Sequence, residues 1–188
     1  MIVEFIKSAS MKDGFINDSR KKIVMVGRSN VGKSSLINAV ANNGSPARVS
    51  SSPGKTTTVN YYMAGKGKAY FIDLPGYGYA KAEKKEKARW AVMMDEFFRH
   101  LDPETALGAL VVDIRHKPMD SDVQMARCFK DFGLPFFVAG NKCDKLKPRE
   151  IAPAVALIKE TLGVEDVVPF SAITVSGKKA LLKQMGLL

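Results

Sequence analysis

A short glycine-rich segment constrains this chain more than any other feature, because residues 27–34 read GRSNVGKS. The segment fits the pattern G-x-x-x-x-G-K-[ST], follows the apolar residues 23–26 and precedes the helix-like sequence SSLINAV. In a loop of this kind, backbone N–H groups and a helix N-terminus converge on phosphate groups, and the glycines let the backbone approach them closely. A glycine-rich turn before a helix is the structural alternative.

This phosphate loop implies a role for each of its residues. We expect Lys33 to reach the β- and γ-phosphates of a nucleotide, and the Ser34 hydroxyl to bind Mg²⁺. The expected nucleotide-binding residues of the loop are Gly27, Arg28, Ser29, Asn30, Val31, Gly32, Lys33 and Ser34.

Strand-like and helix-like segments alternate along the whole chain. The strand-like segments are apolar at consecutive positions rather than at alternate ones, which is typical of parallel strands that helices cover on both faces. The pattern predicts an α/β fold with a mostly parallel central sheet flanked by helices. Strands are expected at residues 22–26, 69–72, 107–112, 135–139 and 167–168. Helices are expected at residues 33–41, about 83–101, 121–132, 148–162 and 178–185.

Two segments need separate interpretation. Residues 59–63 are ambiguous, and they fit an edge strand that forms a hairpin with residues 69–72. In the helix at about 83–101, apolar residues recur at spacings of three and four, which favours a core-facing stripe over a groove for a partner. The stripe consists of Trp90, Met93, Met94, Phe97, Phe98 and Leu101.

Composition limits the class of protein. The chain has 188 residues, of which 46% are hydrophobic and 26% charged, which fits one globular domain and excludes a disordered chain. No apolar run approaches the ~20 residues of a membrane span, and the N-terminus lacks the pattern of a secretory signal, so we expect a cytoplasmic protein without a membrane segment. The excess of 29 Lys and Arg over 19 Asp and Glu gives a net charge of +10 and indicates an anionic partner.

The sequence DLPG, residues 73–76, follows the apolar residues 69–72. Asp73 is therefore expected at the carboxyl end of a buried strand, at the edge of an open α/β sheet where ligands bind. A carboxylate there can hold Mg²⁺ through water, and the Gly76 N–H can contact a γ-phosphate. By itself DLPG is also an ordinary ending of a strand, and its place after the phosphate loop favours the functional interpretation. The expected residues are Asp73, Leu74, Pro75 and Gly76.

Residues 141–144, NKCD, follow the strand at 135–139 and favour guanine as the base. An Asp carboxylate in the plane of the base accepts hydrogen bonds from N1–H and the 2-amino group of guanine, whereas adenine offers neither donor. We expect the stem of Lys142 to lie over the base, Asn141 to tie this loop to the phosphate loop, and residues 170–172 to supply a backbone N–H near the guanine carbonyl. The candidate base-binding residues are Asn141, Lys142, Cys143, Asp144, Phe170, Ser171 and Ala172.

The segments GRSNVGKSSLINA, PGKT, DLPGYGYA, VVDIRHKPMDSD and NKCDKL together resemble the EngB (YihA/YsxC) family, ribosome-biogenesis GTPases of the TrmE-Era-EngA-EngB-Septin-like class. The resemblance covers nearly the whole chain. It implies a three-layer Ras-like P-loop GTPase fold in one domain, with residues 1–20 as an N-terminal extension and 21–188 as the core. It also implies binding of GTP and GDP with Mg²⁺, slow hydrolysis, a role in assembly of the large ribosomal subunit, and an association with normal cell division and septation.

The resemblance also covers residues 53–56, PGKT. Thr56 corresponds to the switch I threonine that joins Mg²⁺ coordination in the triphosphate state, and Gly54 and Lys55 accompany it. The residues by themselves indicate only that a hydroxyl of this loop, on Thr56, Thr57 or Thr58, senses the γ-phosphate. The implied Mg²⁺ ligands are Ser34, Thr56 and Asp73.

The residues for hydrolysis differ from a common pattern. Many small GTPases carry Gln directly after DxxG to orient the attacking water, and this chain has Tyr77 there, so we expect slow intrinsic hydrolysis. Related GTPases with Asn at the position of Asn30 use K⁺ beside the phosphates, which makes K⁺ a candidate second cation, although Asn30 also suits a tight turn. The residues expected to carry hydrolysis are Lys33, Thr56 and Asn30.

Basic residues cluster after the DLPG segment, after the strand at 107–112 and around NKCD. No signature of a sequence-reading RNA module accompanies them, so contact with the shape and phosphates of folded rRNA in the large-subunit precursor is the expected mode. We expect a monomer. Two alternatives stay open, namely a nucleotide-gated rRNA-binding adaptor with incidental hydrolysis, and another P-loop NTPase, against which NKCD argues. The clustered residues are Lys81, Lys84, Lys85, Lys87, Arg89, Arg115, His116, Lys117, Lys142, Lys145, Lys147 and Arg149.

Overall fold

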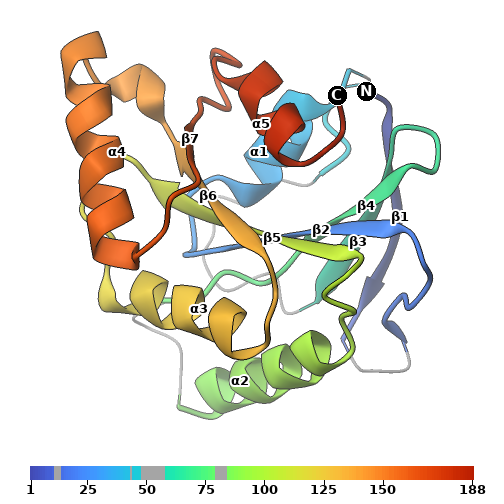
Figure 1. Ribbon diagram of the computed structural model, residues 1–188. Coiled ribbons are helices and arrows are strands. Elements are labelled where there is room, and N and C mark those ends of the chain that lie inside the picture. Colours follow the sequence, from blue (N-terminus) through green and yellow to red (C-terminus); the bar gives the residue numbers. More distant parts are fainter. Residues whose placement is uncertain (11–13, 43, 48–57, 79–83) are drawn as a thin grey trace.

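A seven-stranded sheet organises the molecule in the computed structural model, which describes residues 1–188 except 11–13, 43, 48–57 and 79–83. The order across the sheet is β1-β3-β4-β2-β5-β6-β7 (Figure 1). Strand β2 pairs in parallel with β4 and β5, β6 joins β5 and β7 in parallel, and β3 runs antiparallel to β4 and to β1. The strands are β1 (Val3–Ala9), β2 (Lys21–Gly27), β3 (Val59–Ala64), β4 (Ala69–Asp73), β5 (Ala106–Asp113), β6 (Phe136–Asn141) and β7 (Val167–Pro169).

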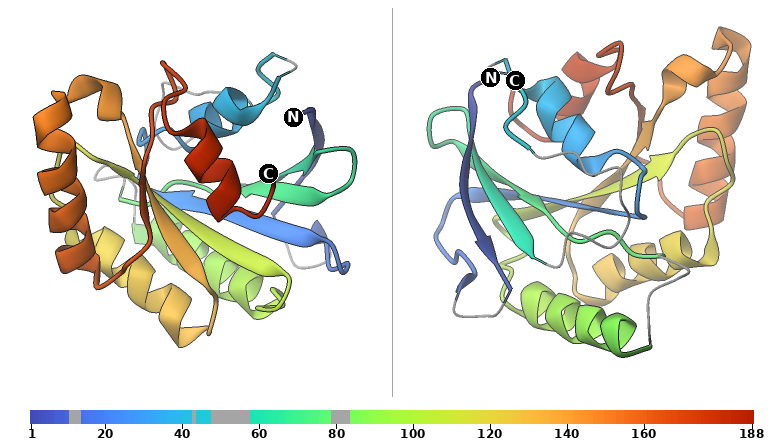
Figure 2. Two further views of the ribbon diagram at one scale, coloured as in Figure 1. Left: turned by 45° about the horizontal axis from the view of Figure 1, so that its top comes forward. Right: turned by 180° about the vertical axis from the view of Figure 1, so that it is seen from behind.

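Helices cover both faces of the sheet, which confirms the expected α/β architecture. Helices α1 and α5 pack on one face, whereas α2, α3 and α4 contribute to the core on the other (Figures 1 and 2). The apolar stripe of α2 lies in that second core, as the sequence predicts, with Met94, Phe97 and Phe98 buried. The helices are α1 (Lys33–Val40), α2 (Lys84–Arg99), α3 (Asp120–Asp131), α4 (Pro148–Leu162) and α5 (Lys178–Gln184), and a short 3₁₀ helix spans Cys143–Lys145.

The central strands are apolar along their length because both of their faces are buried. Residues Ile23, Val24, Met25 and Val26 of β2 are fully buried, and they alternate between the two core clusters. Adjacent residues of one strand point to opposite faces, so a strand between two helical layers needs apolar side chains at every position. This burial places the polar residues of the central strands at their ends.

The N-terminal segment changes one expectation. Residues 59–63 do form a hairpin with β4, but β3 is not an edge strand, because β1 pairs with it from Val3↔Ala64 to Ala9↔Val59. The sequence of β1 does not alternate cleanly, and the register shifts between Phe5 and Lys7, which hides its strand character from a periodicity argument. Part of the segment before residue 21 thus belongs to the sheet.

The ends of the chain lie close together beside α1 and α5 (Figure 2). Within the described part of the chain, none of the helices combines the length and apolar character needed to cross a membrane.

Candidate functional site

Four loops meet where the parallel strands end. The phosphate loop follows β2, Asp73 ends β4, Asp113 ends β5 and Asn141 ends β6. Because β2, β4, β5 and β6 are parallel neighbours, their carboxyl ends lie at the same edge of the sheet. The three expected nucleotide motifs are therefore brought together at one edge.

The phosphate loop has the close packing that its glycines allow. Gly32 has a φ of 100°, a left-handed conformation that favours glycine, and a Cβ there would lie 2.3 Å from Asn141 Nδ2. A Cβ on Gly27 would lie 2.4 Å from the Val111 carbonyl oxygen. The buried Lys33 ammonium group donates to the Gly27 carbonyl oxygen at 3.2 Å, across the loop. The loop is thus a compact cradle at the N-terminus of α1, as an anion site requires.

Ser34 and Asp73 bring a hydroxyl and a carboxylate together beside Lys33. The Ser34 hydroxyl donates to Asp73 Oδ2 at 2.6 Å, and Asp73 Oδ1 is buried without a hydrogen-bond partner. Burial raises the pKa of Asp73, against the effect of Lys33 and Ser34, and burial lowers the pKa of Lys33. An unsatisfied buried carboxylate oxygen next to a hydroxyl fits Mg²⁺, which prefers oxygen ligands and keeps several waters.

The DLPG turn packs directly on the phosphate loop. Ser29 N–H donates to the Tyr77 carbonyl oxygen at 3.0 Å, and a Cβ on Gly76 would lie 2.9 Å from the Ser29 nitrogen. The close approach requires glycine at position 76. Gly76 is therefore held beside the loop that the sequence assigns to phosphates.

Asn141 links the base loop to the phosphate loop, as the sequence predicts. Its Nδ2 donates to the Val31 carbonyl oxygen at 2.8 Å, and its side-chain oxygen accepts from the Lys142 N–H at 2.8 Å and the Ala172 N–H at 3.1 Å. One buried amide thus joins three loops. Of residues 170–172, which are expected to supply a backbone N–H near the guanine carbonyl, Ala172 donates its N–H to Asn141 in this structure.

Lys142 has a partner, Asp113, that the sequence does not predict. Its ammonium group donates to Asp113 Oδ2 at 2.9 Å and to the Asn30 carbonyl oxygen at 3.1 Å. Burial raises the pKa of Asp113, but hydrogen bonds from Arg115 and Lys142 outweigh it and hold that pKa below the usual range. Asp113 could have been predicted as a site residue from its place at the carboxyl end of an expected strand. The structure pairs it with Asn141 at the end of the neighbouring strand.

Asp144 is oriented by Ser171. The Ser171 hydroxyl donates to Asp144 Oδ1 at 2.6 Å, while its oxygen accepts from the N–H groups of Ile173 and Thr174. The hydrogen bond from Ser171 lowers the pKa of Asp144, which keeps the carboxylate ionised as an acceptor. Cys143 and Phe170 are buried and connected by a backbone hydrogen bond from the Cys143 N–H to the Phe170 carbonyl oxygen.

For some residues expected in the site, the structure gives no location or no contact that tests the expected role. Gly54, Lys55 and Thr56, together with Lys81, lie outside the described residues. Asn30 has a φ of 65°, so it occupies the left-handed turn position that suits Asn, and it is exposed.

Comparison with known proteins identifies the family. Residues 22–142 match the family described as 50S ribosome-binding GTPase. A relative from Clostridium perfringens (strain 13 / Type A), named "Probable GTP-binding protein EngB", is 42% identical over 182 residues, which are 95% of this chain and 91% of the relative. The chain belongs to the EngB family of GTPases. The resemblance stated above is thereby confirmed, and GTP is the nucleotide of the family.

Solved structures confirm the fold of this EngB-family chain. A structure titled "Crystal structure of a probable GTP-binding protein engB" superimposes with a TM-score of 0.74 at 24% identity, covering 88% of this chain and 96% of that one. A structure of Era in complex with MgGDPNP and nucleotides 1506–1542 of 16S ribosomal RNA has a TM-score of 0.68 at 23% identity, covering 88% of this chain and 55% of that one. Both are P-loop GTPase folds, as expected of this chain.

Proposed function

We propose that this chain is a GTP-hydrolysing molecular switch in assembly of the large ribosomal subunit, with the association with normal cell division and septation that the family resemblance implies. The observation that carries the nucleotide part is the Asn141 amide, which joins the guanine loop to the phosphate loop at Val31. A single rigid site for both ends of one nucleotide requires such a link. The chain would act as one G domain over residues 1–188, in the cytoplasm and as a monomer.

The proposed binding chemistry follows from the site. Lys33 and the N–H groups of the phosphate loop meet the β- and γ-phosphates, and Asp144 accepts hydrogen bonds from the guanine edge. Ser34, Asp73 and Thr56 would hold Mg²⁺, which supplies charge neutralisation at the phosphate oxygens when it is bound. The Asp73 oxygen without a partner supports this assignment.

Potassium is proposed as the second cation, at Asn30. The Asn30 carbonyl oxygen already contacts the Lys142 ammonium group, and its side chain is exposed at the rim of the phosphate loop. GTP turnover measured in K⁺ and in Na⁺ buffers of equal ionic strength tests this role. Faster turnover in K⁺, lost on Asn30→Ala, is expected, whereas equal rates would contradict it.

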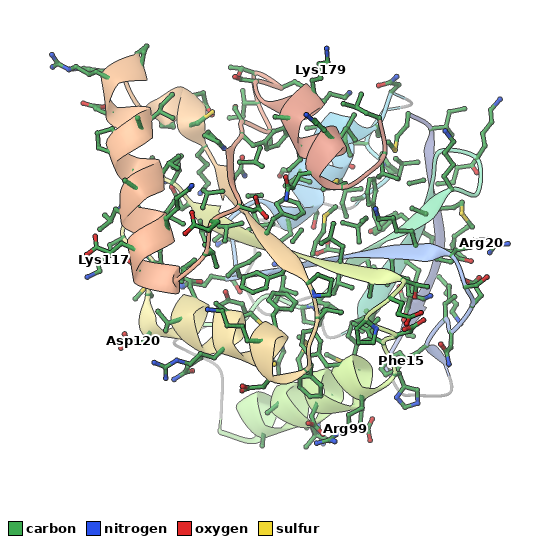
Figure 3. The ribbon with its side chains drawn as sticks, viewed as in Figure 1. Phe15, Arg20, Arg99, Lys117, Asp120 and Lys179 are labelled. Carbon is green, nitrogen blue, oxygen red and sulfur yellow. The ribbon has the colours of Figure 1, made fainter. Side chains whose placement is uncertain are left out.

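The ribosomal partner is supported by the family description, by the rRNA bound to the structurally similar Era, and by charge. Exposed basic side chains surround the base loop and the end of β5, and Lys117 projects outward there (Figure 3). Phosphate contacts by Lys and Arg bind RNA in a way that weakens steeply with salt. The exposed basic residues are Arg115, His116, Lys117, Lys145, Lys147 and Arg149.

Cosedimentation with large-subunit particles tests this role. We expect more protein to sediment with a non-hydrolysable GTP analogue than with GDP, and less as salt rises. The double variant Lys117→Glu with Arg149→Glu should weaken association more than the control Lys179→Glu with Lys183→Glu, which makes the same change of charge on α5. No nucleotide-dependent enrichment would contradict the ribosomal role, and enrichment without any need for hydrolysis would favour the adaptor alternative.

A further inference from the structure

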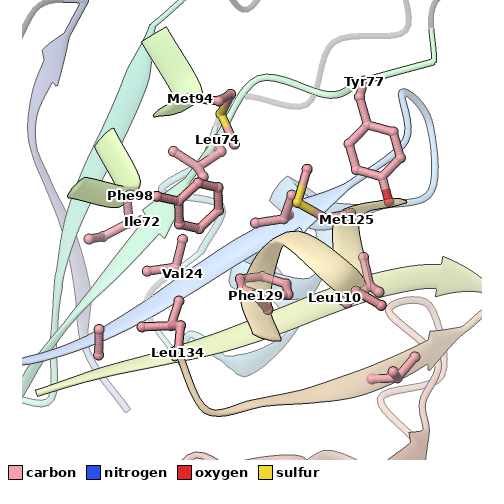
Figure 4. Packing of buried hydrophobic residues seen from close by; sticks show 14 of the residues in the cluster. Val24, Ile72, Leu74, Tyr77, Met94, Phe98, Leu110, Met125, Phe129 and Leu134 are labelled. Carbon is pink, nitrogen blue, oxygen red and sulfur yellow. The ribbon is translucent and has the colours of Figure 1, made fainter. Parts of the chain in front are cut away.

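Tyr77 occupies the position after the DLPG turn, and its phenol reaches the first turn of α3. The side chain is 7% exposed, and Figure 4 shows its hydroxyl beside the start of α3. The hydroxyl donates to Asp122 Oδ1 at 2.7 Å. Asp122 is 4% exposed, and its other oxygen accepts from the Met119 N–H at 2.8 Å. The phenol is therefore fastened to a carboxylate that also caps a helix.

Two further contacts hold the same turn. The Trp90 ring of α2 meets the Tyr77 ring edge-on at 6.1 Å, and the Trp90 indole N–H donates to the Pro75 carbonyl oxygen at 3.2 Å. On the opposite side, the Tyr77 carbonyl oxygen accepts from the Ser29 N–H of the phosphate loop. The turn is thus connected to α2, α3 and the phosphate loop at the same time.

Gly76 lies at the point where these contacts converge. Its backbone is packed against Ser29 so closely that no side chain would fit. Its N–H donates to no partner within the described part of the chain. An N–H that has no partner among the described residues and is held against a phosphate loop can donate to an additional phosphate oxygen.

We propose that Tyr77 is a positioning residue for the triphosphate state: its hydrogen bond to Asp122 holds the DLPG turn so that the Gly76 N–H meets the γ-phosphate, and the state of the turn is passed to α3. The proposal rests on the switch role proposed above, and it does not depend on the ribosomal partner. Tyr77 is then not a substitute for the water-orienting Gln, because its hydroxyl is engaged elsewhere.

Asp122 is connected directly to the basic loop that precedes α3. Asp122 binds the Met119 N–H, and Met119 is exposed at the end of the loop that carries Arg115, His116 and Lys117. The buried phenol and carboxylate cannot separate without each leaving a polar group unpaired, so the pair favours two discrete arrangements over gradual movement. Nucleotide state would therefore change how this basic loop is presented.

The variant Tyr77→Phe tests the proposal, because it keeps the ring against Trp90 and removes only the hydroxyl. We expect the affinity for a non-hydrolysable GTP analogue to fall about tenfold, which corresponds to about 1.4 kcal/mol, while the affinity for GDP stays within about twofold. Trp90 is the only tryptophan in the sequence, so its fluorescence reports on the turn directly. The fluorescence difference between GDP and the analogue should shrink in Tyr77→Phe.

A matched control is available in the same chain. Tyr70 also donates its hydroxyl to a carboxylate, Asp18 Oδ2 at 2.9 Å, but it belongs to the opposite end of β4 from Asp73. Tyr70→Phe should leave both affinities and the Trp90 response unchanged. Asp122→Asn, whose amide keeps one acceptor oxygen for two donors, provides a second variant in case Tyr77→Phe does not fold, and it should show the same selective loss.

Three results would overturn the proposal. An unchanged ratio of analogue to GDP affinity in both Tyr77→Phe and Asp122→Asn would show that the Tyr77–Asp122 hydrogen bond does not position the turn, and it would leave the proposed switch role standing. An equal loss for both nucleotides would make the pair merely structural. If GDP and the analogue gave the same Trp90 fluorescence in the unmodified protein, the proposed switch role and the positioning role of Tyr77 would both be overturned.

Discussion

Asn141 donates from Nδ2 to the Val31 carbonyl oxygen at 2.8 Å across 110 residues of sequence. The same side chain accepts from the Ala172 N–H, so the guanine loop, the phosphate loop and the segment after β7 share one buried amide. The loops that we propose for the two ends of a nucleotide are therefore joined by one side chain in this structure.

Asn141→Ala should weaken GTP and GDP equally, by about tenfold or more, because it leaves buried polar groups of two loops unpaired. Isothermal titration with both nucleotides measures the effect. Asn42→Ala is the control, since Asn42 follows the end of α1, where its side chain accepts from Lys178 at 3.1 Å, at the opposite end of that helix from the phosphate loop. A loss confined to GTP would contradict the shared role of the amide.

Asp144→Asn should change the preferred base. The side-chain amide of the variant keeps an acceptor for N1–H, but its NH₂ group is a donor and would face the 2-amino group of guanine, which is also a donor. Xanthine carries an oxygen at this position, which can accept from the amide. We expect at least about a hundredfold loss of GDP affinity and a gain for xanthosine diphosphate. Competition between the two diphosphates measures it, and Asp166→Asn, an exposed change outside the loop, should leave the base preference as it is.

Ser34→Ala should remove most of the dependence of nucleotide affinity on Mg²⁺. The variant deletes the hydroxyl that lies 2.6 Å from Asp73 Oδ2 and thereby one of the proposed metal ligands. Titration of GTP with Mg²⁺ and with excess chelator should converge on similar affinities. The neighbouring Ser35→Ala on α1 is the control, and an undiminished Mg²⁺ effect in Ser34→Ala would refute the assignment.

Asp113→Asn should lower stability by about 1 kcal/mol at neutral pH, because the hydrogen bonds from Lys142 and Arg115 favour the ionised form. The folded pKa of Asp113 lies below its unfolded value of about 3.9. The stabilising contribution is therefore complete above the unfolded pKa and is lost as pH falls toward the folded pKa. Urea unfolding should show a difference between the two proteins at pH 7 that narrows below about pH 4. A constant difference across this range would show that ionisation is not its cause.

Local patterns made most of the fold predictable. Short stretches of consecutive residues encode the glycine-rich loop, the NKCD segment and the buried strands, because hydrophobic periodicity and turn-forming residues act over a few positions. The N-terminal strand was missed for the same reason: β1 has an irregular register and leaves Phe5 and Ile6 exposed, so its pattern carries no clear signal.

The pairings within the site depended on more distant information. Residues 170–172 are expected to supply a backbone N–H near the base, and the structure adds that the Ser171 hydroxyl binds Asp144, 27 residues away. Asp113 was unassigned until the register placed it beside Asn141. Neither contact follows from spacing, because each depends on which strands are neighbours.

The sequence by itself determined the class of fold and the family, and it supplied the two loops that we propose for phosphate and guanine, because these depend on residue types at short, regular spacings. The tertiary structure decided how the loops cooperate: which oxygen of Asp73 lacks a partner, which carbonyl Asn141 holds, and where the Tyr77 hydroxyl points. Tyr77 and Asp122 are 45 residues apart, and only the packing of the turn against α3 brings them together. Such contacts follow from strand order and register, which are properties of the whole chain.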